Sequence, residues 1–258
     1  MSAKSSRSSQ FRLHLLLDIL AIAGWGILLL KYWLTNKLVL LIHPNYFGLA
    51  VVSGVFLICI SAIKVAELLK QKRQRPSKYL ANVQHMTLFP PGLSSAILLA
   101  TAIVGLIVTP KVFASQTAIQ RGIADTNTIT RTQAQSFRAS VKPEDRSLID
   151  WVRTLDNNPE PDDYKGQKAK VQGFVVHPPD FPPEYIMLSR FVITCCAADV
   201  YPVGIPIKLP QNRQAYPSDS WLEVQGKMLT ATLNNKRQLT IEAASLTKIP
   251  EPKNPYDY

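Results

Sequence analysis

Two cysteines stand side by side at positions 195 and 196, at the end of the apolar run in "RFVITCCAADVYPVG". Neighbouring side chains of a regular strand point to opposite faces, so Cys195 and Cys196 can share a partner only where the strand has ended. Three arrangements remain open. The first is a soft metal site that Asp199 and His177 complete, the second is a reversible disulfide between neighbours, and the third is ordinary packing with one thiol inward.

Arg190 lies within the same apolar run, five residues before Cys195. An ion pair with Asp199, or with a carboxylate on a neighbouring strand, is the interpretation that we favour. The other role for this guanidinium is to hold an anionic ligand or to lower a thiol pKa. The candidate ligand-binding residues are therefore Arg190 and Asp199, and the candidate metal ligands are Cys195, Cys196 and Asp199.

No established catalytic pattern accompanies these residues. The sequence has no phosphate-binding Gly-rich loop, no GxSxG, no HExxH and no CxxC pair, and each of these motifs carries a recognisable chemistry. Redox enzymes usually separate their two cysteines by two residues, which this chain does not do. We therefore predict a protein that is not an enzyme.

The cysteines belong to a region that alternates as strands do. Apolar and polar residues alternate in five short runs separated by turns rich in Pro, Asn and Asp, and Gly173 and Gly226 suit bulges or bends within them. Five strands in under 100 residues predict an OB-like five-stranded barrel, with a small β-sandwich as the alternative. The strands are expected at 167–176, 185–195, 203–209, 220–233 and 237–249.

A short helix is expected to lead into these strands. In "PEDRSLIDWVRTLDNNPE", the residues Leu148, Trp151, Val152 and Leu155 share one helical face. The segment 111–142 before it is rich in Ser, Thr, Gln and Ala and is typical of a polar tether. The predicted organisation is a helical region at 1–110, a tether at 111–142 and an all-β domain at 143–258.

Three apolar runs dominate the N-terminal region, near 13–30, 46–63 and 93–109. A bilayer span takes about 20 residues, so we predict three transmembrane helices. No small-x-small cleavage site follows the first run, which favours a retained helix over a signal peptide. Asp18 is the acid within that run; it predicts a functional or helix-contact role, unless its side chain reaches the nearby membrane surface.

Charge predicts the orientation of these helices. Residues 1–141 carry 15 Lys and Arg against 3 Asp and Glu, whereas residues 142–258 carry 14 against 15. The basic excess therefore belongs to the membrane region, which argues against nucleic acid as a partner. Lys and Arg concentrate in the N-terminal tail and at 64–78, so both are expected in the cytoplasm. Three crossings then place the C-terminal domain outside the cytoplasm.

The apolar spans, "YKGQKAKVQGFV", "RFVITCCAADVYPVGIPI", "WLEVQGK" and the closing "IPEPKNPYDY" together resemble the YcgQ-like bacterial membrane-protein family. The resemblance covers nearly the whole chain, and the stretch around the two cysteines is its most specific part. It implies a location at the bacterial cell (inner) membrane, a partner subunit of a multi-spanning permease, and a link to zinc, which is the candidate metal. The predicted function is a non-enzymatic membrane subunit whose external domain docks the permease and binds its substrate or a metal ion. The alternative is a membrane-anchored thiol-redox or metal-handling protein acting through Cys195 and Cys196.

Overall fold

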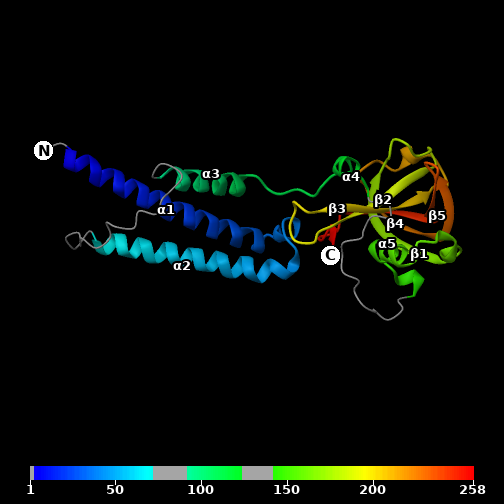
Figure 1. Cartoon of the computed structure of the whole chain (residues 1–258), viewed down its shortest axis with the longest axis horizontal. Coiled ribbons are helices and arrows are strands. Elements are labelled where there is room, and N and C mark those ends of the chain that lie inside the picture. The colour runs from blue at the N-terminus through cyan, green and yellow to red at the C-terminus, as the bar shows by residue number, and fades with distance from the viewer. Residues whose placement is uncertain (1–2, 72–91, 124–141) are drawn as a thin grey trace. The chain divides into compact units, whose positions relative to one another are not determined.

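The computed structural model describes residues 3–71, 92–123 and 142–258. The chain divides into two compact units, Met1–Pro110, here the helical unit, and Lys111–Tyr258, here the sheet unit (Figure 1). The helices of the described residues are α1 (Ala3–Leu34), α2 (Phe47–Gln71), α3 (Leu93–Ile107), α4 (Ser115–Arg121) and α5 (Leu148–Asn157). The strands are β1 (Lys168–Val176), β2 (Tyr185–Val192), β3 (Tyr201–Lys208), β4 (Trp221–Leu233), β5 (Lys236–Ile249) and β6 (Tyr256–Asp257).

Two segments of the helical unit are long and apolar enough to cross a membrane. They are Leu13–Leu34, with 22 residues, and Pro44–Lys70, with 27 residues, which confirms the long apolar helices expected near 13–30 and 46–63. The third apolar helix, α3, has 15 residues, fewer than the about 20 that a span requires. A third crossing near 93–109 therefore stays a prediction.

Small residues let the helices α2 and α3 approach α1 closely. A Cβ added at Gly26 would lie 2.9 Å from the Ile58 side chain and 3.0 Å from the carbonyl oxygen of Gly54 in α2. A Cβ added at Gly24 would lie 3.2 Å from the Ala102 side chain of α3. Glycine contacts of this kind are typical of helices that pack in membranes. They place α1 against both α2 and α3 (Figure 1).

Side chains of α1 also donate hydrogen bonds to backbone carbonyls of α3. The indole Nε1 of Trp25 donates to the carbonyl oxygen of Leu98 at 3.0 Å, and the Tyr32 hydroxyl donates to that of Gly105. Residue numbers increase together along both helices, so α1 and α3 run parallel.

The contacts between α1 and α2 run in the opposite order. The hydroxyl of Ser61 in α2 donates to the Ile19 carbonyl at 3.4 Å, whereas Gly54 faces Leu30. At these contacts the residue numbers rise along α1 as they fall along α2, so α2 is antiparallel to α1. The three helices thus alternate in direction.

The six strands of the sheet unit form one mixed sheet in the order β1-β4-β5-β3-β2-β6. Neighbours pair antiparallel except β3 with β5 and β2 with β6, which pair parallel. β1 also pairs with β2, so each strand from β1 to β5 has at least two neighbours. The five strands expected from the sequence are confirmed, although β2 ends at Val192 rather than at Cys195. The two-residue β6 was not expected.

Backbone geometry explains two features of the long β4–β5 hairpin. Asn234 and Asn235 at its tip have φ values of 52° and 61°, as a two-residue hairpin turn of the favoured type requires. The register shifts between Gln225 and Gly226, where a Cβ at Gly226 would lie 2.1 Å from the Glu242 carbonyl oxygen. The shift leaves Ala244 of β5 without a partner in β4, so the irregularity expected near Gly226 is confirmed and its extra residue lies on β5.

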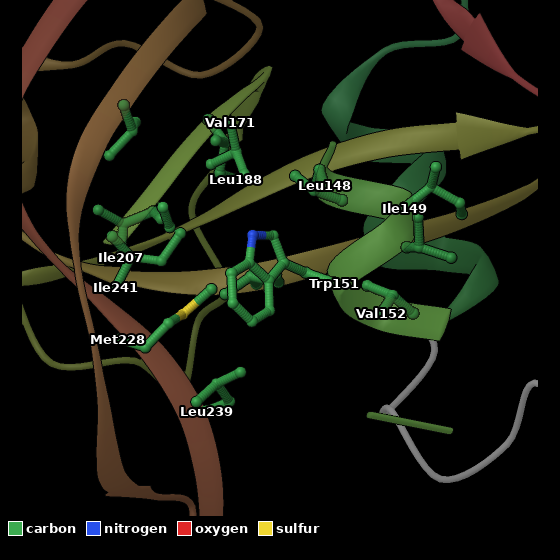
Figure 2. Close-up of a cluster of buried hydrophobic side chains, with 14 of the residues drawn as sticks. Leu148, Ile149, Trp151, Val152, Val171, Leu188, Ile207, Met228, Leu239 and Ile241 are labelled. Atoms are coloured by element: carbon green, nitrogen blue, oxygen red, sulfur yellow. The ribbon is translucent and has the colours of Figure 1, made fainter. Parts of the chain in front are cut away.

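Helix α5 contributes one face to the core of the sheet unit. The Ser147 side chain accepts a hydrogen bond from the Asp150 amide, and Asp150 accepts one in return, so a capping box starts the helix. Trp151 is fully buried, and Figure 2 shows its indole directed from α5 toward Met228 and Ile241. The predicted helical face is thus confirmed, and it packs on the sheet.

The polar segment expected at 111–142 is described only in part, because residues 124–141 lie outside the described residues. Its first residues pack on the sheet unit. The Phe113 ring stacks on Tyr256 with centroids 6.1 Å apart, and the Ser115 amide at the start of α4 donates to the Asp219 carboxylate at 2.5 Å. The chain therefore joins the sheet unit six residues after α3 ends at Ile107.

We predict that Trp151→Ala destabilises the sheet unit by about 3–5 kcal/mol, because it removes a fully buried indole from a packed core. Urea unfolding of residues 111–258 measures the free energy. Trp151→Phe retains a buried ring and should cost distinctly less. A loss below about 1 kcal/mol for the alanine variant would contradict the role of α5 as part of the core.

Candidate functional site

A tight turn at residues 194–199 follows β2 and contains the two adjacent cysteines. The Asp199 carboxylate accepts hydrogen bonds from the backbone amides of Cys195 at 2.8 Å and Cys196 at 3.1 Å. The Thr194 hydroxyl donates to the same carboxylate at 2.5 Å. The Asp199 amide, in turn, donates to the Cys196 carbonyl at 3.0 Å. Both oxygens of Asp199 are thus engaged in holding the turn.

This arrangement shifts two pKa values in opposite directions. Burial raises the pKa of Asp199, but hydrogen bonds from the Thr194 hydroxyl and the turn amides together outweigh it, so that the pKa lies below its ordinary value. The pKa of the Cys195 thiol is raised by its hydrogen bond to the Cys196 thiol, then by burial and by the negative charge of its neighbours. Because the thiolate is the reactive form, Cys195 is a weak nucleophile at neutral pH.

The turn has few groups to offer a metal ion. Among residues 3–71, 92–123 and 142–258, no three His, Cys, Asp or Glu side chains gather where they could hold one. His177 Nε2 lies 2.8 Å from the Tyr216 carbonyl oxygen, which ties this imidazole to a loop. Zinc binding by Cys195, Cys196 and Asp199 stays a prediction.

Arg190 faces the C-terminal strand rather than the cysteine turn. Its Nε lies 3.1 Å from Oδ2 of Asp257 in β6, and its Nη2 donates to Oδ1 at 3.3 Å. The guanidinium also lies over the Trp221 ring, 5.3 Å from its centroid. Of the two ion-pair partners that the sequence left open, the structure shows the carboxylate on a neighbouring strand and not Asp199. Arg190 and Asp199 are therefore not brought together.

The Asp257 carboxyl lies in a more buried position than an ordinary surface ion pair. Burial is the largest influence and raises its pKa, Arg190 and Arg153 lower it, and Asp150 raises it again, so that the pKa remains above its ordinary value. An ion pair in such surroundings positions elements more than it stabilises them. Here it fixes the end of the chain to β2.

A charged cavity of about 310 Å³ lies beside this ion pair and includes the start of α5. Basic and acidic side chains both line it, and its size is at the lower end of small-molecule sites. The candidate residue Arg190 therefore faces a space that a small polar ligand can occupy. The charged residues of the lining are Glu144, Asp145, Arg146, Lys170, Arg190 and Asp257.

The closing residues of the chain make contacts that the sequence analysis did not predict. Tyr256 is buried against Phe113 and Phe191, and burial raises its pKa to about 12. The Arg153 guanidinium donates to the backbone oxygen of Tyr258 at 2.7 Å. The two tyrosines of "PYDY" could have indicated this packing, because two bulky aromatic rings in a polar segment usually need a place to pack.

Comparison with known proteins places both units in one family. Residues 17–124 match the model of the DUF1980 N-terminal domain, and residues 120–258 match the model of the DUF1980 C-terminal domain. No curated protein matches the chain. The models describe an uncharacterised family, so the YcgQ-like resemblance and the permease partnership stay predictions.

We predict that Cys195 is alkylated by iodoacetamide at neutral pH more slowly than an ordinary exposed thiol, because its pKa is raised. Cys196→Ala removes the largest cause and should shift the pH–rate profile of Cys195 to lower pH. Peptide mass spectrometry separates Cys195 from Cys59, and Asp180→Asn is the control outside the turn. A pH–rate profile of Cys195 whose midpoint lies at or below that of an ordinary exposed thiol would contradict the prediction.

Proposed function

The chain belongs to the DUF1980 family, and from this premise we propose that it is a non-enzymatic membrane subunit of a permease complex. The helical unit anchors the protein and contacts the permease, while the sheet unit lies outside the cytoplasm and binds a small polar ligand. The permease is the proposed partner because the sequence resembles a family associated with one.

One observation carries the proposal. Within the described residues, the exposed large apolar side chains all lie between Leu13 and Val108, apart from Ile119 of α4. An apolar surface of this extent is unfavourable in water and marks contact with lipid or with another protein. Within its described residues, the sheet unit exposes one large apolar side chain, Ile119.

The alternating helix directions support three crossings. Because α1 and α3 run parallel and α2 runs antiparallel to α1, consecutive helices cross in the order that three spans need. The α1 donors that bond α3 carbonyls also match the way polar side chains join membrane helices. Lys and Arg at the N-terminal tail and at 64–78 favour a cytoplasmic N-terminus.

The strand pairings support an OB-like barrel as the external domain. Following the pairs β1-β2-β3-β5-β4 returns to β1, and β3–β5 is the parallel pair. The register shift at Gly226 supplies the bend that a small barrel needs. Folds of this kind bind ligands on their surface, and the cavity beside Arg190 and Asp257 is the proposed place.

A thiol-redox role is the second candidate, and one contact favours it. The Cys196 thiol is the largest cause of the raised pKa of Cys195, so the two adjacent thiols interact. The raised pKa of Cys195 opposes rapid exchange, however, because exchange proceeds through the thiolate. We also give the turn no metal in this proposal, since no three His, Cys, Asp or Glu side chains of the described residues gather where they could hold one.

For the topology, we expect alkaline phosphatase fused after Tyr258 to be active and the same enzyme fused at Gln74 to be inactive. Phosphatase folds only outside the cytoplasm, where its disulfides form, so activity reports the side of the membrane. Activity at both positions would contradict three crossings. A fusion at Lys37, in the loop between the first two spans, should be active and serves as the internal control.

For the partnership, we expect detergent extraction to yield a complex with a larger multi-spanning protein. On α2 the residues Leu49, Val52, Phe56 and Ile63 are exposed at the spacing of a helix–helix seam. Val52→Trp should therefore release the partner through a steric clash.

The control is Leu20→Trp, on an exposed position of α1, which should leave the complex intact. Co-purification from native membranes and mass spectrometry of the bound protein measure both variants. A partner-free chain from native membranes, or retention of the partner by Val52→Trp, would count against this docking seam.

A further inference from the structure

A cavity of about 450 Å³ lies among the three helices of the helical unit. Most of its wall is apolar, but Asp18, Trp25, Lys64 and Ser95 also line it. Charged side chains inside a membrane segment are costly and usually serve a function. An acid and a base that face one cavity therefore need an explanation beyond helix packing.

The polar side chains that line this cavity differ in whether they have a hydrogen-bond partner. The Ser95 hydroxyl of α3 donates to Oδ1 of Asp18, and Trp25 Nε1 is engaged by the Leu98 carbonyl. Lys64 and Asp18 both line the cavity, yet the described residues show no ion pair between them. The helix contacts thus use one oxygen of Asp18 and leave the Lys64 ammonium available.

Asp18 and Lys64 lie near the same end of their apolar segments, although α1 itself begins at Ala3. Asp18 is five residues inside the start of Leu13–Leu34, and Lys64 is six residues before the end of Pro44–Lys70. At 1.5 Å per residue these offsets are about 7.5 and about 9 Å. Because α2 is antiparallel to α1, the two charges stand at a similar level, close to the boundary between headgroups and acyl chains.

We propose that this cavity binds the headgroup of a zwitterionic phospholipid that carries a primary ammonium and a phosphodiester. The lipid ammonium donates to the Asp18 carboxylate, the phosphate accepts from the Lys64 ammonium, and an acyl chain covers the apolar wall. The inference rests on the proposed membrane insertion. Charge complementarity selects this occupant, because one acid and one base match a headgroup that has both signs.

The complementarity also separates this lipid from an anionic one. Phosphatidylglycerol has the phosphate that Lys64 requires but no ammonium for Asp18, so the charge of Asp18 stays unmatched. Phosphatidylethanolamine satisfies both groups. A site of this kind therefore distinguishes two phospholipids that carry identical acyl chains.

The test uses the full chain in detergent, titrated with phosphatidylethanolamine or phosphatidylglycerol and measured by native mass spectrometry. We expect about tenfold tighter binding of phosphatidylethanolamine, which corresponds to ~1.4 kcal/mol. Asp18→Asn keeps an acceptor for Ser95 and should abolish the preference. Lys64→Gln should weaken the binding of both lipids.

Glu67→Gln and Lys70→Gln are the matched controls, since they neutralise the same kinds of charge on α2 without lining the cavity. Both should bind lipid as the unmodified chain does. Equal binding of the two lipids, or lipid binding by Asp18→Asn and Lys64→Gln that matches the controls, would overturn the lipid site alone. Release of the chain from membranes by alkaline carbonate would instead overturn membrane insertion, and with it this inference.

Discussion

A charged or polar group in apolar surroundings needs a partner, and this constraint determines how the elements of the chain are held together. In the helical unit, Asp18 accepts from Ser95, so that α3 is tied to α1. In the sheet unit, Arg190 on β2 pairs with Asp257, so that the chain end is tied to the sheet. Removing one member of such a pair leaves the other without compensation. The same few polar groups therefore decide both packing and the places where ligands can bind.

Local patterns made the helix α5 and the five longer strands predictable. The apolar face of α5 repeats at helical spacing, and Ser147 followed by Asp150 after three residues is a capping signal. The strands have clear alternation and turn residues at their ends. Gly226 was predictable as a bulge because a glycine inside a strand usually marks a close approach of another backbone. Each of these features depends on neighbours in the sequence.

Contacts between distant residues could not be predicted in the same way. Arg190 and Asp257 are 67 positions apart, and nothing near Arg190 in the sequence indicates which of several carboxylates it meets. The strand β6 has two residues, too few to show alternation. In the helical unit, the apolar runs indicated where helices lie but not that Trp25 and Tyr32 of α1 face α3. Such pairs become visible only when the fold brings the elements together.

The cysteine turn differs, because its main contacts are local and were nonetheless not predicted. Two neighbouring thiols suggested a site, and Asp199 was assigned to them as a third ligand. Its carboxylate instead binds the amides of Cys195 and Cys196, as Asp side chains often do in turns. This explains why the strand ends before the cysteines, since these amides no longer bond a neighbouring strand. It also sets the chemistry of the turn, because an anion held beside Cys195 disfavours its thiolate. The turn thus suits a pair of neutral thiols better than a nucleophile, and the charged cavity beside Arg190 is the stronger candidate for ligand binding in the sheet unit.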